Sequence, residues 1–125
     1  MIGKIYTAMF KFLNAKNQQM EFKYRPVLII GRADYTDYVV LPISSVSISD
    51  NVDKYYDIEI HKDKYTLLKL AKDVSYIRTN KQTVLNFKEI EREISDLKTL
   101  YPDLFKDIMD KVAEFQQELQ NSAFL

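Results

Sequence analysis

The chain has 125 residues with 18 basic and 18 acidic side chains, so its formal net charge is zero. That length supports a single domain, residues 1–125, and the absence of cysteine excludes disulfide scaffolds, thiolate zinc sites and cysteine catalysis. No apolar run approaches the roughly 18 residues of a membrane-spanning helix, and the start lacks the apolar region of a signal peptide. We therefore expect a cytoplasmic protein. Neutrality alone argues against a partner bound mainly through charge, such as nucleic acid.

The first two thirds of the chain predict antiparallel strands, because apolar and polar residues alternate in short runs rich in Tyr, Val, Ile and Phe. The expected strands cover residues 4–13, 20–30, 38–44, 55–60 and 74–79, with a short addition at 83–85. Polar segments connect them, including residues 14–19, 31–37 and 47–53. From the lysine-rich segment 61–72, we expect packing onto the core by Leu67, Leu68 and Leu70.

The last third predicts helices. Asn86 followed by Glu89 suits a helix N-cap, and apolar residues recur at helical spacing at Phe87, Ile90, Ile94 and Leu97. Pro102 suits the first turn of a second helix, whose apolar stripe is Phe105, Ile108, Val112, Phe115 and Leu119. Strands first and helices last indicate an α+β fold. We expect residues 1–85 to form a small antiparallel β-barrel and residues 86–125 a helical C-terminal part.

Arg25 stands directly before a proline in a hydrophobic strand. Proline cannot donate to a strand ladder, so Pro26 marks an edge or a bulge, and it keeps the preceding arginine extended. A guanidinium suits phosphate because its planar fork carries several N–H donors and stays charged. The same pattern also fits an arginine on a solvated face.

Two further segments place polar groups near strand ends. In residues 39–45, Pro42 again interrupts a buried strand, and Ser44 and Ser45 follow. A hydroxyl there can donate to a phosphoryl oxygen, or it can satisfy loop backbone groups. Residues 74–82 interleave basic and aromatic side chains, as suits a surface that stacks bases and holds phosphates, although solvated charges at a strand end give the same pattern.

Other kinds of site find no support in the sequence. His61 is the only histidine and lies in a charged stretch, which favours a surface residue over a general base. No cluster of His, Asp and Glu has metal-ligand spacing, and there is no glycine-rich phosphate loop. We therefore predict neither a metal nor a cofactor.

Four segments, taken together and in order, resemble the MazF/PemK (Kid) family of toxins from bacterial toxin–antitoxin pairs. They are the strand start Gly3 to Tyr6, then Arg25 to Ile30, Pro42 to Ser45, and Ile77 to Thr79. Each segment alone is a weak signal, but four in this order are fairly specific. The resemblance covers residues 3 to about 115.

The resemblance implies an SH3-like barrel with a terminal helix, acting as a homodimer. It implies a metal-independent endoribonuclease that cuts single-stranded RNA, often mRNA, at short sequences and is neutralised by an antitoxin protein. Arg25 matches the family's catalytic arginine, Ser44 stands where many members place a catalytic threonine, and Arg78 matches the arginine of the Ile-Arg-Thr segment. We expect the RNA to be held by Tyr24, Ser45, Tyr76, Arg78, Thr79 and Lys81.

The chemistry that the resemblance implies suits these residue types. RNA carries its own nucleophile, the 2′-hydroxyl, so an enzyme must align that group and stabilise the negative charge that develops on the phosphorus. Arg25 can supply the charge stabilisation, and Ser44 can hydrogen-bond a phosphoryl oxygen or the 2′-hydroxyl; the sequence assigns no group to proton transfer. Two departures affect substrate choice: Tyr76 replaces a glutamine of several members, and residues 18–24 replace a glycine-rich approach.

A non-catalytic toxin or adaptor on the same barrel is the main alternative, because CcdB-type gyrase poisons show that this fold can act by binding protein. Their activity relies on a hydrophobic C-terminal end, and the present sequence ends in Ala123-Phe124-Leu125. An inactive relative carried by a phage or other mobile element is a third interpretation.

The zero net charge is a sum of two unequal parts. Residues 1–85 carry 13 basic and 9 acidic side chains, a balance of +4, whereas residues 86–125 carry 5 basic and 9 acidic side chains, a balance of −4. Eight of the nine tyrosines also lie in the first part. A basic, tyrosine-rich barrel is compatible with RNA, and its modest excess charge predicts few phosphate contacts.

Overall fold

The structure, a computed structural model, describes residues 1–46 and 49–125. Its strands, in chain order, are β1 (Ile5–Asn14), β2 (Gln19–Arg32), β3 (Asp37–Ser44), β4 (Asp57–His61), β5 (Val74–Arg78), β6 (Thr83–Asn86) and β7 (Ile90–Ser95). Two helices follow, α1 (Leu97–Leu100) and α2 (Pro102–Ser122). The six predicted strands are confirmed. Of the loop predicted over 47–53, positions 47 and 48 lie outside the described residues, and a 3₁₀ turn covers Ser49–Asn51.

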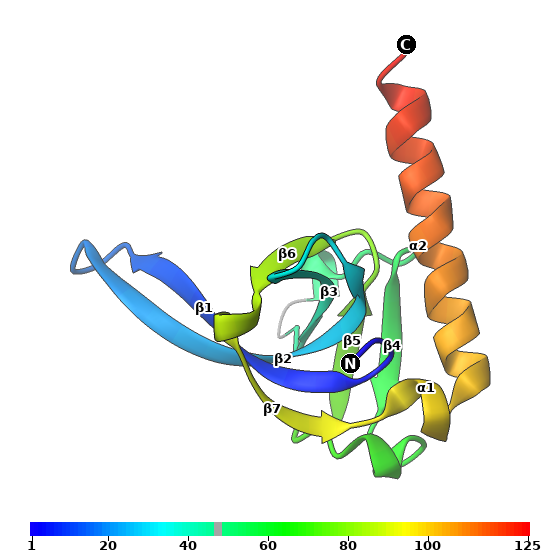
Figure 1. Cartoon of the computed structure of the whole chain (residues 1–125), viewed down its shortest axis with the longest axis horizontal. Helices are drawn as coiled ribbons and strands as arrows, with labels where there is room; N and C mark the ends of the chain where they lie inside the picture. Colours follow the sequence, from blue (N-terminus) through cyan, green and yellow to red (C-terminus); the bar gives the residue numbers. More distant parts are fainter. Residues whose placement is uncertain (47–48) are drawn as a thin grey trace.

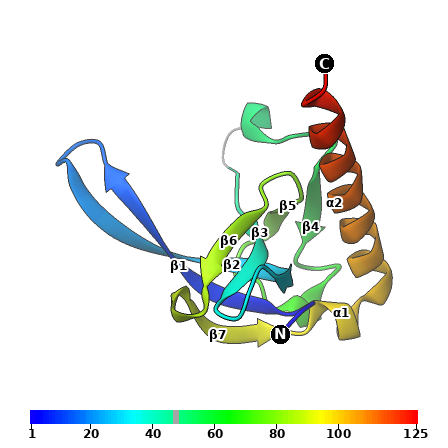
Figure 2. The ribbon, with the colours of Figure 1, turned by 45° about the horizontal axis from the view of Figure 1, so that its top comes forward.

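All paired strands run antiparallel, in the order β4-β5-β3-β2-β1-β7. β3 is shared, because its first half pairs with β6 and its last two residues pair with β5. This fork lets the sheet curl, and Figure 1 shows the strands wrapped into a half-barrel with α2 standing along β4. Figure 2 shows the same arrangement of α2 and β4 after rotation. The fold is therefore α+β, a curled antiparallel half-barrel with C-terminal helices, which confirms the predicted class and the order of strands before helices.

Two buried clusters lie on opposite faces of the central strands. The larger one joins the sheet to the helices and includes Ile5, Leu28, Leu41, Ile43, Ile77, Leu97, Ile108 and Val112. The smaller one lies against β1, β2, β3 and β6 and consists of Ala8, Val27, Ile29, Val40 and Leu85. Burial of β3 on both faces agrees with its continuous apolar sequence.

The helix predicted from Asn86 is wrong. Asn86 and Glu89 do form a capping box, but it closes a single 3₁₀ turn over Phe87–Glu89, and strand β7 follows. β7 pairs with β1, from Ile5 opposite Ser95 to Ala8 opposite Ile90. Before β7 adds to it, the edge of β1 has unpaired backbone N–H and C=O groups. Hydrogen bonds to that edge favour a strand over residues 90–95, although four apolar residues at helical spacing favour a helix there. The predicted boundary between barrel and helices accordingly moves from residue 86 to Leu97.

Helix α2 begins at Pro102, as predicted. The middle of its predicted stripe is buried, with Ile108 at 0% and Val112 at 2% exposure, whereas Leu119 is 60% exposed. The end of the helix extends past the sheet, which leaves Leu119 without core to pack against (Figure 1). Leu68 and Leu70 join the core as expected, and Leu67 does not.

β1 and β2 continue beyond the sheet as a two-stranded arm. Their pairing extends from Ile5 opposite Leu28 to Asn14 opposite Gln19. The pairing of β1 with β7 stops at Ala8, and the pairing of β2 with β3 begins at Val27, so the hairpin beyond these residues has no third strand. The arm, residues 9–24, projects from the half-barrel in both Figure 1 and Figure 2.

Candidate functional site

The site lies where β2 and β3 separate. Their last paired residues at this end are Val27 and Pro42, and Pro26 follows on β2. Neither proline has an N–H to donate, so each removes one hydrogen-bond donor from the strands at the point where they separate. Continuing the register by two residues places Arg25 opposite Ser44. Beyond Pro42, β3 pairs with β5 instead, with Ser44 opposite Tyr76.

Arg25 and Ser44 line two adjoining pockets together. The first has a volume of about 240 Å³ and is lined by Lys23, Tyr24, Arg25, Pro26, Ile43, Ser44, Ser45, Leu70, Ala71, Lys72 and Ser75. The second, of about 380 Å³, is lined by Phe10, Phe12, Lys23, Arg25, Pro42, Ser44, Arg78 and Lys81. Lys23, Arg25 and Ser44 belong to both, so the two pockets form one groove with these three side chains at its middle.

The groove is positively charged. Its lining includes five cationic side chains, Lys23, Arg25, Lys72, Arg78 and Lys81, and no carboxylate among the residues that the structure describes. Arg25 forms no ion pair or side-chain hydrogen bond with any described residue, so its guanidinium is available to a ligand. Clefts of one charge sign concentrate ions of the opposite sign. The arrangement therefore suits an anionic ligand.

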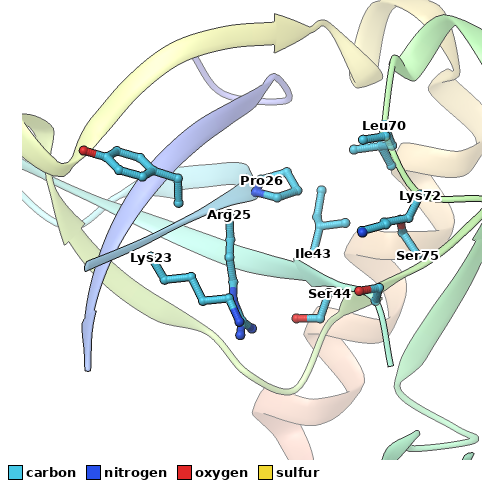
Figure 3. A pocket seen from close by; sticks show the side chains of 11 residues that line it. Lys23, Arg25, Pro26, Ile43, Ser44, Leu70, Lys72 and Ser75 are labelled. Atoms are coloured by element: carbon cyan, nitrogen blue, oxygen red, sulfur yellow. The ribbon is translucent and has the colours of Figure 1, made fainter. Parts of the chain in front are cut away.

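Figure 3 shows how the side chains lie. Lys23 and Arg25 extend from β2 toward the side of the pocket where the hydroxyl of Ser44 lies. Lys72 comes from across the pocket, beside Leu70 and Ser75. Ser44 itself is only 9% exposed, so little of its side chain is open to solvent although it lines both pockets.

Arg78 is tied to the protein rather than free in the groove. Its Nε donates to Asp57 Oδ1 at 3.2 Å, and its Nη2 donates to Asp57 Oδ2 at 3.0 Å and to the Asn51 carbonyl at 2.7 Å. The Asp57 side chain is fully buried, and that of Arg78 is 13% exposed. Arg78 thus ties the turn at Asn51 and strand β4 at Asp57 to β5, and its side chain also lines the groove.

The other predicted site residues fall into two groups. Tyr24, Ser45 and Lys81 line the groove with Arg25. Thr79 and Tyr76 line neither pocket. Thr79 is completely buried and donates to the Tyr56 carbonyl at 2.6 Å, which is a structural role in place of the predicted RNA contact.

Tyr76 hydrogen-bonds within the sheet. Its hydroxyl donates to Glu59 Oε1 at 3.2 Å. Partial burial and the neighbouring Glu59 carboxylate together raise the pKa of Tyr76 above its usual value. The side chain is therefore a neutral donor engaged with β4, at the rim of the site.

Sequence reasoning missed Lys23, Lys72, Phe10 and Phe12. Lys23 stands two residues before Arg25 on the same strand, so strand alternation alone places both side chains on one face. Phe10 requires the hairpin register, which sets it opposite Lys23. Lys72 comes from the segment between β4 and β5, and only the tertiary fold brings it to the groove.

In comparisons with known proteins, no family model matches the chain and no curated protein matches it. Among the residues that the structure describes, neither helix has the length and apolar character needed to cross a membrane. The function is therefore inferred from the geometry of the groove and from the four segments that resemble the toxin family.

Proposed function

We propose that the protein is an endoribonuclease that cuts single-stranded RNA by attack of the 2′-hydroxyl on the adjacent phosphorus. The observation that carries the proposal is the position of Arg25 and Ser44, which share both pockets of a groove lined by five cationic side chains. A free guanidinium beside a nearly buried hydroxyl is suited to hold a phosphodiester in one orientation. The groove is open at both pockets, as a continuous strand requires.

The reaction needs three elements, of which the groove offers two. The 2′-oxygen forms a bond to phosphorus, the bond from phosphorus to the 5′-oxygen breaks, and the products are a 2′,3′-cyclic phosphate and a 5′-hydroxyl. Arg25 stabilises the additional charge on the non-bridging oxygens, with Lys23 nearby. Ser44 donates to one of these oxygens or orients the 2′-hydroxyl. Proton transfer is the third element, and no described residue of the groove is assigned to it.

The resemblance to the toxin family supports this proposal in two respects. The half-barrel with a terminal helix is compatible with the SH3-like barrel of MazF/PemK toxins. The Arg-Pro pair and the hydroxyl after Pro42 come together in space from separate strands. We include in the proposal that the chain acts as a growth-inhibiting homodimeric toxin neutralised by an antitoxin.

The direct test is incubation of the purified protein with long single-stranded RNA in EDTA. We expect discrete cleavage products ending in a cyclic phosphate. Arg25→Ala should reduce the cleavage rate at least 100-fold, by analogy with the loss of one preorganised donor in other enzymes, about 10²–10³. Arg32→Ala is the matched control, because Arg32 lies on the same strand β2 at its far end and hydrogen-bonds the Tyr35 carbonyl at 2.9 Å.

Two outcomes contradict the proposal. One is an intact RNA after prolonged incubation with the folded protein. The other is cleavage by Arg25→Ala at the rate of Arg32→Ala, which would indicate a contaminating nuclease. A protein that leaves RNA intact but captures a protein partner would favour the non-catalytic alternative.

A further inference from the structure

The arm formed by β1 and β2 carries aromatic and basic side chains on one of its faces. Side chains alternate between faces along a strand, so Ala8, Phe10 and Phe12 of β1 share a face with Arg25 and Lys23 of β2. The register sets Ala8 opposite Arg25 and Phe10 opposite Lys23. Directly opposite side chains are about 5 Å apart at Cβ. Phe10 therefore lies beside Lys23, one of the cations that hold the phosphate in the proposed function, whereas Phe12 lies one facing pair further along the arm, opposite Glu21.

Phe12 faces the groove, and Phe10 lies between the groove and the smaller buried cluster, against which it packs. Both line the larger pocket together with Arg25, Ser44 and Lys81. Phe12 is 39% exposed although it is aromatic and apolar. An exposed ring that borders a cationic groove is accessible to a base that enters the groove.

We propose that Phe10 and Phe12 form a stacking subsite for one nucleobase next to the phosphate bound by Arg25. This inference rests on the proposed function and specifies how the substrate lies: its phosphate at Lys23, Arg25 and Ser44, and the adjoining base against the arm. Stacking on aromatic side chains is a common, sequence-tolerant way to hold single-stranded nucleic acid. Double-stranded RNA is excluded from this subsite because its bases are stacked on one another.

The smaller pocket is chemically different, which gives the substrate a direction. Its walls beyond the shared residues hold the hydroxyls of two serines, several apolar side chains and Lys72, and its one aromatic residue is Tyr24. The larger pocket has two phenylalanine rings and about 380 Å³ of space, against about 240 Å³ in the smaller one. The base on one side of the bound phosphate is therefore held by stacking, and the nucleotide on the other side lies against a mixed wall of apolar, hydroxyl and lysine side chains.

The opposite face of the arm supplies a matched control. It carries Leu13, Met20 and Phe22, which are 56%, 60% and 58% exposed. Phe22 is opposite Lys11 in the register and lines neither pocket of the groove. Phe12→Ala and Phe22→Ala remove the same ring from the same hairpin, but only the first removes it from the groove.

The test uses the site of cleavage mapped on long RNA with the wild-type protein. A short oligonucleotide spanning that site is made with a 2′-deoxy nucleotide at the scissile position, so that it binds without being cut. Neighbouring bases are replaced one at a time by 2-aminopurine, whose fluorescence falls on stacking. We expect one position beside the scissile phosphate to be quenched on binding, and Phe12→Ala to abolish the quench and weaken binding about tenfold.

Phe22→Ala should keep the quench and bind within about twofold of wild type. Phe12→Tyr should behave as wild type, because it retains the ring. An abasic nucleotide at the quenched position should weaken binding by the wild-type protein. It should not weaken binding by Phe12→Ala further, since both changes remove the same contact.

Equal effects of Phe12→Ala and Phe22→Ala on the fluorescence quench and on binding would contradict the stacking subsite. Wild-type affinity for the abasic oligonucleotide equal to that for the intact one would also contradict it. Neither result affects the proposed function, which fails on the separate criterion that Arg25→Ala cleaves RNA as well as Arg32→Ala. Circular dichroism of each variant establishes that the arm change has not unfolded the domain.

Discussion

At the scale of single residues, Arg78 lines the groove, but its guanidinium is held in place by a buried carboxylate, that of Asp57. Its segment resembles the toxin family and lines the groove, but two of its three guanidinium nitrogens are engaged by Asp57 and Asn51. The buried Asp57 carboxylate also accepts from the Asp53 backbone N–H at 2.8 Å. Asp57 was not distinguishable from any other acidic residue in the sequence, because only the fold brings it under Arg78.

The pair predicts an asymmetric response to mutation. Asp57→Ala should lower the free energy of unfolding by about 3–5 kcal/mol, because it leaves a buried guanidinium without its partner. The double variant Asp57→Leu/Arg78→Met should lose less than Asp57→Ala, because no unpaired charge remains. Urea denaturation measures both. A variant Arg78→Met that loses RNA binding but no stability would contradict this structural role.

Gly3 is a second residue whose structural role is not evident from the sequence. Its φ of +88° lies in the region that favours glycine, and an added Cβ would come within 2.5 Å of the Lys98 Cβ. Its backbone joins β2 to α1, donating to the Ile29 carbonyl and accepting from the Lys98 N–H.

Gly3→Ala should therefore destabilise the domain by more than the roughly 1 kcal/mol of a strained backbone alone, because Gly3 and Lys98 must also move apart to make room for the added Cβ. Gly31→Ala is the matched control: an added Cβ at Gly31 meets nothing within 4 Å. Thermal unfolding compares the two, and equal melting temperatures would contradict the prediction.

At the scale of elements, β7 marks the limit of pattern reading. Ile90 and Ile94 are separated by four residues, which suits either one face of a helix or one face of a strand, and the capping box before them favoured the helix. The free edge of β1 decides for the strand. The strands themselves were predictable because their alternation is unambiguous, and α2 was predictable because Pro102 and a long apolar stripe agree.

The attachment of β7 to β1 has a measurable electrostatic signature. Glu93 accepts from Lys4 Nζ at 2.9 Å and from the Tyr6 hydroxyl at 3.3 Å. The hydrogen bond from Lys4, followed by its charge, lowers the pKa of Glu93 below 4.5. A lowered pKa stabilises the fold above pH 4.5, and this contribution is lost as the pH falls through the lowered value.

Carboxyl NMR titration should therefore give Glu93 a midpoint below 4.5 in the wild type, and Lys4→Met should raise it. Lys88→Met is the control, because Lys88 has no ion pair with Glu93. The pair is partly exposed, so the effect of Lys4→Met on stability should be small. An unchanged midpoint in Lys4→Met would show that β7 does not lie against β1 as described.

At the scale of the whole molecule, charge is divided between two regions. The basic excess of residues 1–85 includes the groove, whereas the helical part is acidic. The groove was only partly predictable from the sequence. The Arg-Pro segment indicated Arg25, and the hydroxyl that follows Pro42 indicated Ser44. The contribution of the arm depends on the hairpin register, which local sequence does not reveal.

This division limits how strongly salt can affect binding. Of the five groove cations, Arg78 is already paired with Asp57, so about four remain for phosphates. For single strands, the logarithm of the binding constant falls with the logarithm of the salt concentration by about 0.7 per neutralised phosphate. We therefore expect a slope of about −3 in such a plot for the non-cleavable oligonucleotide. A slope steep enough for six or more phosphates would indicate a binding surface other than this groove.

The forked pairing of β3 has a consequence for how the molecule opens. β3 donates and accepts backbone hydrogen bonds with β2 on one edge and with β6 and β5 in turn on the other. Its amides are therefore protected from solvent unless both buried clusters come apart, whereas the arm has only one ladder and reaches the smaller cluster through Phe10. Amide hydrogen exchange should be slowest in Val40 and Leu41 and fastest in residues 9–24, so the arm can open and close on an intact half-barrel.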